Sequence, residues 1–333
     1  QDQAGLPAPQ ATDSFDTDFT APAIGIDTPL AGDGVLNAAE QAGGLAITGT
    51  TDAEDGQQVT VTVGGGTPVT GTASGGVWSV TVPAADLTGL ADGANIPVTA
   101  DVTDAAGNPA PQATADFDTD FIATITIDPL PLGGDGVLNA AEQAGGLAIT
   151  GTTTGVEDGQ VVAVTLNGAA LPGPVTVQAG GVWSVTVPAA DLTGLADGAN
   201  IPVTADVTDA AGNPAPQATD SFATDFTPPT IQITAPIAGD DVLNNAESGA
   251  PLEISGTSTG ADGRQVTVMV GATELTTNVQ PGGAWSVTLG DPSTLADGVN
   301  IAVTADVTDD AGNPAPQATA DFDTDFTATI AID

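Results

Sequence analysis

The sequence predicts an all-β protein built from three tandem antiparallel β-sandwiches arranged as a linear rod. The first observation is internal repetition, because residues 75–114 are identical to residues 180–219. The second is spacing, because Trp78, Trp183 and Trp285 recur at intervals of 105 and 102 residues. The third is that short β-branched runs alternate apolar and polar residues with a period of two, without helical periodicity.

The repeat length indicates separate domains, each with its own core. A period near 100 residues is far longer than the roughly 20–45 residues of a solenoid repeat and fits independent domains. We expect repeat 1 at residues 21–121, repeat 2 at 122–226 and repeat 3 at 227–326. Residues 1–20 read as the tail and linker of a preceding repeat, and residues 327–333 as the start of a next one. The chain therefore looks like a piece of a longer protein.

Each repeat is expected to hold about seven strands in order, of the immunoglobulin-like sandwich type. In repeat 2 the alternating runs are 125–127, 147–151, 162–166, 183–187 and 201–207. The chain has no Cys, so the disulfide of antibody domains is missing and only the architecture is predicted. Trp183 shares its parity with Val185 and Val187, which favours a core position over a sugar-stacking platform.

The composition excludes several classes of function. One cation, Arg264, stands against 43 acidic residues, which gives a net charge of −42. This excludes nucleic-acid binding by phosphate neutralisation, argues against docking on an anionic membrane, and indicates cations as partners. No Cys or His is present, so thiol chemistry, His acid–base chemistry and ordinary zinc sites are absent. We expect no membrane insertion in this segment, because no apolar run reaches roughly 20 residues.

Chain direction sorts the loops of each sandwich, with strands lettered A, B, C, C′, E, F and G. The B–C and F–G loops then lie at the N-terminal pole of a repeat, and the A–B and E–F loops at its C-terminal pole. In repeat 2 these loops contain 155–159 (B–C), 208–213 (F–G), 134–142 (A–B) and 191–198 (E–F). The acidic residues therefore gather at the joints between repeats.

The joint between repeats 1 and 2 is expected to collect Asp92, Asp118, Asp120, Asp158 and Asp209. Two such charges at 4 Å repel by about 1 kcal/mol in water and more near a protein surface. Calcium, which takes about six to eight oxygen ligands in flexible geometry, would reverse that repulsion. We expect several Ca²⁺ ions per repeat. The candidate ligands in linkers and in B–C, E–F and F–G loops are Asp16, Asp18, Asp55, Asp92, Asp104, Asn108, Asp118, Asp120, Asp158, Asp197, Asp209, Asn213, Asp225, Asp262, Asp297, Asp309, Asn313, Asp323 and Asp325.

The A–B loop carries the most specific single signal, the segment GDGVLNAAE. Asp33, Asn37 and Glu40 match positions 5, 9 and 12 of a calcium-binding EF-hand loop, but the first half of that loop is absent. We expect a metal site here, and the alternative is an acidic turn. With the acids that end strand A, the candidates are Asp27, Asp33, Asn37, Glu40, Asp128, Asp135, Asn139, Glu142, Asp240, Asn244 and Glu247.

Four copies of an FDTDF-like segment hold all eight Phe residues, at 15–19, 117–121, 222–226 and 322–326. We expect the first Phe to close the core of the repeat being left. We expect the second to pack at the joint or under the repeat being entered, while the Asp residues between them bind the ion. In the third copy Ala223 replaces one Asp, so that joint has one ligand fewer. The alternative is a solvated acidic linker without an ion.

In order along the chain, the segments GDGVLNAAE, GVWSVTVPAADL, LADG and VTADVTDAAGNPA resemble the tandem immunoglobulin-like extender repeats of giant calcium-dependent RTX adhesins. These are the biofilm and ice-binding adhesins exported by type I secretion. The resemblance implies an extracellular, monomeric stalk at the bacterial cell surface, in which neighbouring repeats and calcium make a stiff rod. The alternative is a lectin-like or protein-binding module, which would need a non-repeated aromatic patch that the sequence lacks. An enzyme is not expected, because the paired acids recur in every repeat.

Overall fold

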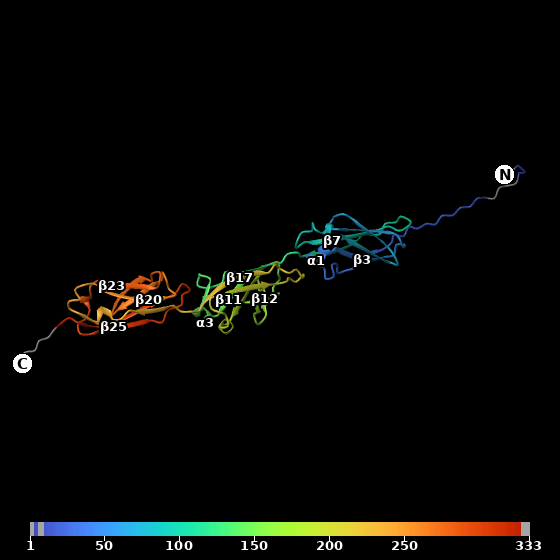
Figure 1. Cartoon of the computed structure of the whole chain (residues 1–333). Coiled ribbons are helices and arrows are strands. Elements are labelled where there is room, and N and C mark those ends of the chain that lie inside the picture. The colour runs from blue at the N-terminus through green and yellow to red at the C-terminus, as the bar shows by residue number, and fades with distance from the viewer. Residues whose placement is uncertain (1–2, 6–9, 328–333) are drawn as a thin grey trace, which may run out of the picture.

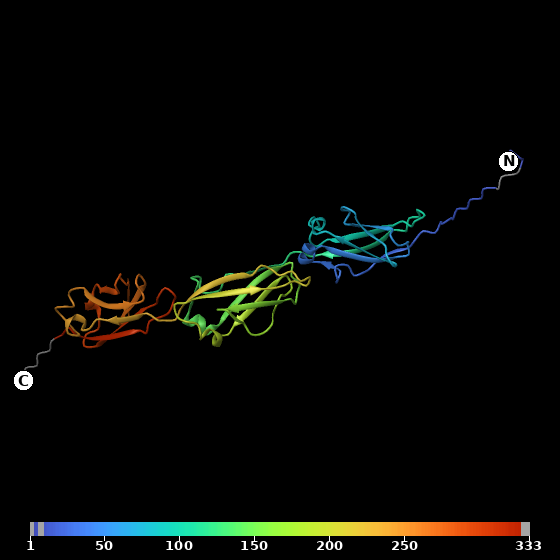
Figure 2. The same cartoon turned by 45° about the vertical axis from the view of Figure 1, so that its right-hand side comes forward.

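The computed structural model describes residues 3–5 and 10–327, and it shows sandwiches placed end to end (Figure 1). The N- and C-terminal ends of the chain lie at opposite ends of this row, and the rotated view keeps the extended shape (Figure 2). The predicted start of a further repeat lies outside the described residues beyond Thr327. No described helix is long and apolar enough to span a membrane.

Repeat 1 consists of two sheets, with strand orders β1-β3-β6 and β2-β8-β7-β4-β5. Its elements are β1 (Ile24–Ile26), β2 (Val35–Leu36), α1 (Ala38–Gly43), β3 (Leu45–Thr51), β4 (Gln58–Val63), β5 (Val69–Thr72), β6 (Val77–Val82), α2 (Ala84–Leu87), β7 (Asn95–Val102) and β8 (Ala113–Thr119). This is the immunoglobulin-like arrangement that the sequence predicts.

Repeat 2 has the same two sheets, β9-β11-β15 and β10-β17-β16-β12-β13, with β14 also paired to β12. Its elements are β9 (Thr124–Ile127), β10 (Val137–Asn139), α3 (Ala140–Gly145), β11 (Leu147–Thr154), β12 (Val161–Leu166), β13 (Ala169–Ala170), β14 (Val175–Thr176), β15 (Val182–Val187), α4 (Ala189–Leu192), β16 (Asn200–Asp206) and β17 (Ala218–Asp225).

Repeat 3 contains the sheets β18-β20-β23 and β19-β25-β24-β21-β22. Its elements are β18 (Thr230–Ile233), η1 (Ile237–Gly239), β19 (Val242–Asn244), β20 (Leu252–Thr259), β21 (Gln265–Val270), β22 (Thr273–Asn278), β23 (Ala284–Leu289), η2 (Pro292–Thr294), β24 (Asn300–Val307) and β25 (Ala318–Asp325).

Two features of the A–B loop differ from the prediction of antiparallel strands alone. A short strand pairs in parallel with the last strand of its own repeat, for example Val35 with Asp118 and Leu36 with Thr119. This pairing buries Leu36 completely. The loop then forms the six-residue helix α1, which begins at a capping box made by Asn37 and Glu40. The sequence contains this cap signal, but the period-two pattern of the strands does not reveal so short a helix.

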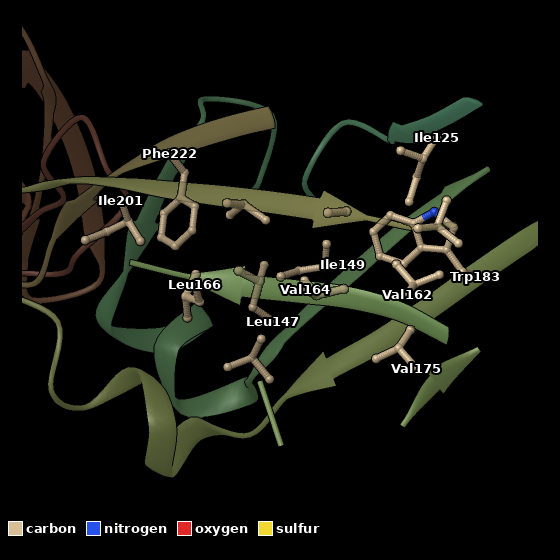
Figure 3. Packing of buried hydrophobic residues seen from close by; sticks show 14 of the residues in the cluster. Ile125, Leu147, Ile149, Val162, Val164, Leu166, Val175, Trp183, Ile201 and Phe222 are labelled. Atoms are coloured by element: carbon tan, nitrogen blue, oxygen red, sulfur yellow. The ribbon is translucent and has the colours of Figure 1, made fainter. Parts of the chain in front are cut away.

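The core of each sandwich is bounded by an aromatic residue at either end. Figure 3 shows Trp183 at one end of the repeat 2 core and Phe222 at the other, with Ile149 and Val164 between them. Trp78, Trp183 and Trp285 are only 2%, 1% and 2% exposed, so the predicted core position of Trp is confirmed. Trp183 faces Gly151 on the neighbouring strand β11, where a side chain would leave no room for the indole.

Candidate cation-binding joints between repeats

Asp120 is the centre of the joint between repeats 1 and 2. Burial raises the pKa of its carboxyl above the ordinary value, and the charges of Asp209, Asp92 and Glu157 raise it further against a backbone hydrogen bond from Ile122. These charges come from three different loops. Asp92 accepts a hydrogen bond from Phe121 N, next to Asp120, and Asn213 Nδ2 donates both to Asp209 Oδ2 and to Asp120 O, so the structure brings these three acids to one joint as predicted.

The B–C loop contributes a different acid from the predicted one. Glu157 Oε2 accepts a hydrogen bond from Ala210 N at 2.8 Å, so it lies against the F–G loop that faces the joint. The predicted Asp55 instead accepts from Gly75 N at 2.6 Å, on the turn before β6. Asp262 likewise accepts a hydrogen bond from Gly282 N at 3.4 Å. In repeat 2, Asp158 occupies the sequence position of Asp55 and Asp262. Glu157 directly precedes Asp158, so only the loop geometry distinguishes the two.

Asp118 belongs to strand β8 rather than to a linker, so that part of the prediction is wrong. Its Oδ1 accepts a hydrogen bond from Asn95 Nδ2 at 2.9 Å on the exposed side of the sheet. Asp323 pairs with Asn300 in the same way at 3.3 Å. Pairing of β8 with β7 reaches Asp118 and pairing with β2 reaches Thr119, which leaves Asp120 as the acid of the joint. A metal-ligand role for Asp118 stays a prediction.

The N-terminal copy of the linker, residues 15–19, is exposed along its length. Its Phe15 and Phe19 are each 87% exposed. Asp18 Oδ1 accepts a hydrogen bond from Thr20 N at 2.9 Å, and Asp16 is exposed beside it. The carbonyl of Asp18 accepts a hydrogen bond from Asn108 Nδ2 at 3.2 Å, as that of Asp120 does from Asn213 Nδ2, but Phe15, Asp16 and Phe19 are exposed to solvent.

The F–G loop closes on its own acid. Asp209 Oδ1 accepts from Asn213 N at 2.7 Å, and its Oδ2 accepts from Asn213 Nδ2 at 2.8 Å. Both residues are 4% exposed. The same two bonds join Asp104 to Asn108 and Asp309 to Asn313. In repeat 1 the Asn108 side chain holds the pKa of Asp104 below its ordinary value.

The E–F loop acid fastens the chain as it leaves a repeat. Asp92 Oδ1 accepts from Phe121 N at 2.6 Å, and Asp197 and Asp297 bind Phe226 N and Phe326 N at the same distance. The hydroxyl groups of Thr227 and Thr327 also hold the pKa of Asp197 and Asp297 below the ordinary value. Ile122 occupies this position after repeat 1, so Asp92 lacks the hydroxyl partner.

The two Phe residues at the end of each repeat both lie on the repeat that the chain is leaving. Phe117, Phe222 and Phe322 are at most 2% exposed in the core of the repeat being left, as predicted. Phe121, Phe226 and Phe326 are partly buried against that same core. Of the two predicted places, the one under the repeat being entered is wrong, because these rings pack on the core of the repeat being left, at the end where the E–F acid binds their backbone N–H.

The EF-hand-like residues of the A–B loop build a turn and a helix start. Asp33 Oδ1 accepts from Val35 N at 2.9 Å, Asn37 Oδ1 from Glu40 N at 2.9 Å, and Glu40 Oε2 from Asn37 N at 3.0 Å. The equivalent bonds are made by Asp135, Asn139, Glu142, Asp240, Asn244 and Glu247. These oxygen atoms have partners within the loop, so the alternative of an acidic turn, extended by a helix cap, explains the partial match, and a metal-ligand role for these residues stays a prediction.

A surface hollow beside this loop is lined by Asp27 and Glu40 together with Leu30, Gly32 and Gly44. Asp27 Oδ2 accepts from Thr48 Oγ1 at 2.7 Å, and Asp128 Oδ2 from Thr150 Oγ1 at 2.8 Å. Across residues 3–5 and 10–327, no three acidic side chains are close enough to form a ready metal site. A cation at these loops would need amide and carbonyl oxygens and water as well, which is the mixed oxygen set that calcium accepts.

Comparison with known proteins agrees with the fold and the repeat. The bacterial Ig-like domain family matches residues 228–326. A solved structure from a 1.5-MDa bacterial ice-binding adhesin, described in relation to host cell surface retention, is 28% identical with a TM-score of 0.50, covering 92% of this chain and 98% of that one. A Ca²⁺-stabilised adhesin with which an Antarctic bacterium binds ice is 30% identical with a TM-score of 0.46, covering 93% of this chain and 75% of that one. No curated protein matches the chain.

The fold and these matches define a protein of tandem immunoglobulin-like sandwiches. The family match covers repeat 3, and repeats 1 and 2 share with it the segments VTADVTD and AGNPAPQAT. The chain belongs to the bacterial Ig-like domain family, and the solved structures similar to it include ice-binding adhesins, which confirms the resemblance seen in the sequence.

Proposed function

We propose that this chain is part of the stalk of a bacterial cell-surface adhesin and holds an adhesive module away from the cell. The observation that carries the proposal is the end-to-end row of sandwiches joined by the same loops at each joint (Figure 1). Such a row gives length and direction, which are the properties of a spacer. The chain works outside the cell as a single-chain rod.

Calcium is the cation that we propose for the joints. Joint 1–2 would use Asp92, Asp120, Glu157 and Asp209, whose charges act together on Asp120. When bound, the ion supplies the positive charge that these carboxylates lack, and hard oxygen ligands favour calcium. Joint 2–3 would use the equivalent Asp197, Asp225 and Asp309, with Ala261 in place of the Glu. The Antarctic relative, described as Ca²⁺-stabilised, is in keeping with this choice.

The alternative of a lectin-like or protein-binding module gains no support from the described residues. All three Trp residues are buried in the cores. The strongly exposed aromatic residues of the described part are Phe15 and Phe19, which lie in the N-terminal linker copy. An aromatic binding platform on a sandwich face is therefore not observed there.

Thermal unfolding in EDTA, in calcium and in equal magnesium tests the proposal. Calcium at 100 times its Kd would add about 2.7 kcal/mol per site to the free energy of unfolding. We expect a clear rise in melting temperature in calcium and a smaller one in magnesium. The variant Asp92→Asn/Asp120→Asn/Glu157→Gln should lose part of that rise.

The matched control removes three charges from strand faces instead, as Asp101→Asn/Asp206→Asn/Asp306→Asn. Each of these acids binds a Gln side chain on the exposed sheet, and none is among the acids proposed for the joints. The control should keep the full calcium response. An equal response in all three proteins would contradict calcium binding at joint 1–2.

A further inference from the structure

Each joint also contains hydrogen bonds between repeats that involve no charged side chain. At joint 1–2, Asn37 Nδ2 donates to Ala211 O at 3.0 Å, and Ala38 N donates to Asn213 Oδ1 at 2.8 Å. Asn213 Nδ2 donates in turn to Asp120 O in the linker at 3.0 Å. The side-chain amide of Asn213 in repeat 2 thus contacts both the A–B loop of repeat 1 and the linker that follows it.

Joint 2–3 repeats this arrangement bond for bond. Asn139 Nδ2 donates to Ala311 O at 2.8 Å, Ala140 N to Asn313 Oδ1 at 3.0 Å, and Asn313 Nδ2 to Asp225 O at 3.0 Å. The acids of the two joints differ, because Ala261 replaces Glu157. The amide contacts are therefore independent of how many carboxylates the joint holds.

The local structure explains why these amides are held in place. Asn213 and Asn313 are 4% and 1% exposed, and each is tied through its backbone N and its Nδ2 to the Asp of its own loop. Ala38 is the first residue of α1, where an N–H has no acceptor within the helix. Asn37 uses Oδ1 for its own helix cap, which leaves Nδ2 for the next repeat.

The undocked poles of the same chain show what docking changes. One alanine position of the F–G loop differs in burial among the repeats: Ala106 is exposed, Ala211 is half-buried and Ala311 is buried. Only the last two face an A–B loop of a preceding repeat. In the A–B loops, Asn37 and Asn139 are half-buried, whereas their counterpart Asn244 in repeat 3 is exposed.

We propose that Asn213 and Asn313, together with Asn37 and Asn139, are the positioning residues of a cation-independent dock that sets the angle between neighbouring repeats. The partner that fits this surface is a repeat that presents Asp-x-Ala-Gly-Asn in its F–G loop to the Asn-Ala of an A–B loop. The inference rests on the proposed stalk function, and it gives the amides and the cation separate roles at the joint. The neutral amides fix the direction of the joint, and the cation relieves the charge repulsion that loosens it.

Electron–electron distance measurements between two spin labels test this dock. The chain has no Cys, so Ser79→Cys and Ser184→Cys place labels at equivalent exposed positions of repeats 1 and 2. The test variant is Asn37→Ser, because Ser still caps a helix but has no amide Nδ2 to reach across the joint to Ala211 O. The matched control is Asn244→Ser, the same position with no repeat docked on it.

In EDTA we expect the native chain and Asn244→Ser to give one peak at the same distance as in calcium, only broader. Asn37→Ser should lose that peak in EDTA. A native chain without the peak in EDTA, or an Asn37→Ser chain that keeps it, would overturn the dock. Circular dichroism of each variant checks folding, and Asn139→Ser with labels at Ser184→Cys and Ser286→Cys tests joint 2–3 independently. The measurements in calcium test the stalk proposal separately, because they ask only whether calcium narrows the distance distribution of the native chain.

Discussion

The core of each sandwich needs a glycine opposite its buried Trp, as the pair Gly151 and Trp183 shows. A Cβ at Gly151 would lie 2.0 Å from Thr126 O and 2.5 Å from the Trp183 ring. Gly49 and Gly256 have the same relation to their Trp residues. The Trp is thus placed by the absence of a side chain on the facing strand.

We expect Gly151→Ala to lower the free energy of unfolding of repeat 2 by about 3 kcal/mol, because overpacking displaces both the indole and a strand. Urea unfolding followed by Trp fluorescence measures the change. Gly145→Ala is the control, since it lies at the end of α3 with no atom within 4 Å of the added Cβ. Equal stability of the two variants would contradict the close-approach explanation.

The linker Phe residues allow a second comparison at this scale. Phe222 is 2% exposed, so Phe222→Ala should cost about 3–5 kcal/mol through the lost contacts and the cavity. Phe15→Ala alters the same sequence position in a copy that is 87% exposed, and it should change stability by less than about 0.5 kcal/mol. Denaturant unfolding of both variants checks the difference, which would vanish if Phe222 were not a core residue.

At the scale of elements, the joint depends on loops from two repeats that meet around Asp120. The pKa of Asp120 is raised in the folded protein, so the folded joint binds a proton on this carboxylate more tightly than the unfolded chain does. The ionised form therefore opposes folding, fully so above the raised pKa. Protonation relieves that opposition as the pH falls through the raised value.

We expect Asp120→Asn to raise the melting temperature in EDTA at neutral pH and to reduce the further rise that calcium causes. The gain over the native chain should shrink as the pH falls toward the ordinary carboxyl pKa near about 4. Melting curves in EDTA across this range measure it, with Asp101→Asn as a strand-face control. A lower melting temperature for Asp120→Asn in EDTA would show that the carboxylate stabilises the joint without a cation.

The elements also show what the sequence contains and what it lacks. Alternation along one strand is a local property, so the sandwich, the buried Trp residues and the buried first Phe follow from the sequence. The loop poles follow from chain direction, which correctly brings Asp92 and Asp209 to Asp120. The choice of Glu157 over Asp158 and the fold-back of Phe121 depend on contacts between loops, and no periodic pattern records these. In the A–B loop, a capping box uses the same Asn and Glu as half of an EF-hand loop, so the sequence pattern alone does not distinguish the two.

At the scale of the whole molecule, a chain of net charge −42 keeps an extended row of sandwiches (Figure 2). The one described salt bridge, Arg264 with Asp310 at 3.2 Å, is exposed and local to repeat 3, and such pairs contribute little. In the proposed stalk, the repeated amide contacts at both joints give direction, while repulsion among the acids loosens those joints until a cation neutralises them. Stiffness would then be a property that the surrounding ions set.

Small-angle X-ray scattering of the chain in EDTA, in millimolar calcium and in equal magnesium tests this central claim most directly. We predict that calcium increases the maximum dimension and gives a more rod-like profile than EDTA, with magnesium much less effective, because bent joints become rarer. Identical profiles in all three solutions would contradict a calcium-stiffened stalk and leave the acidic joints without that function.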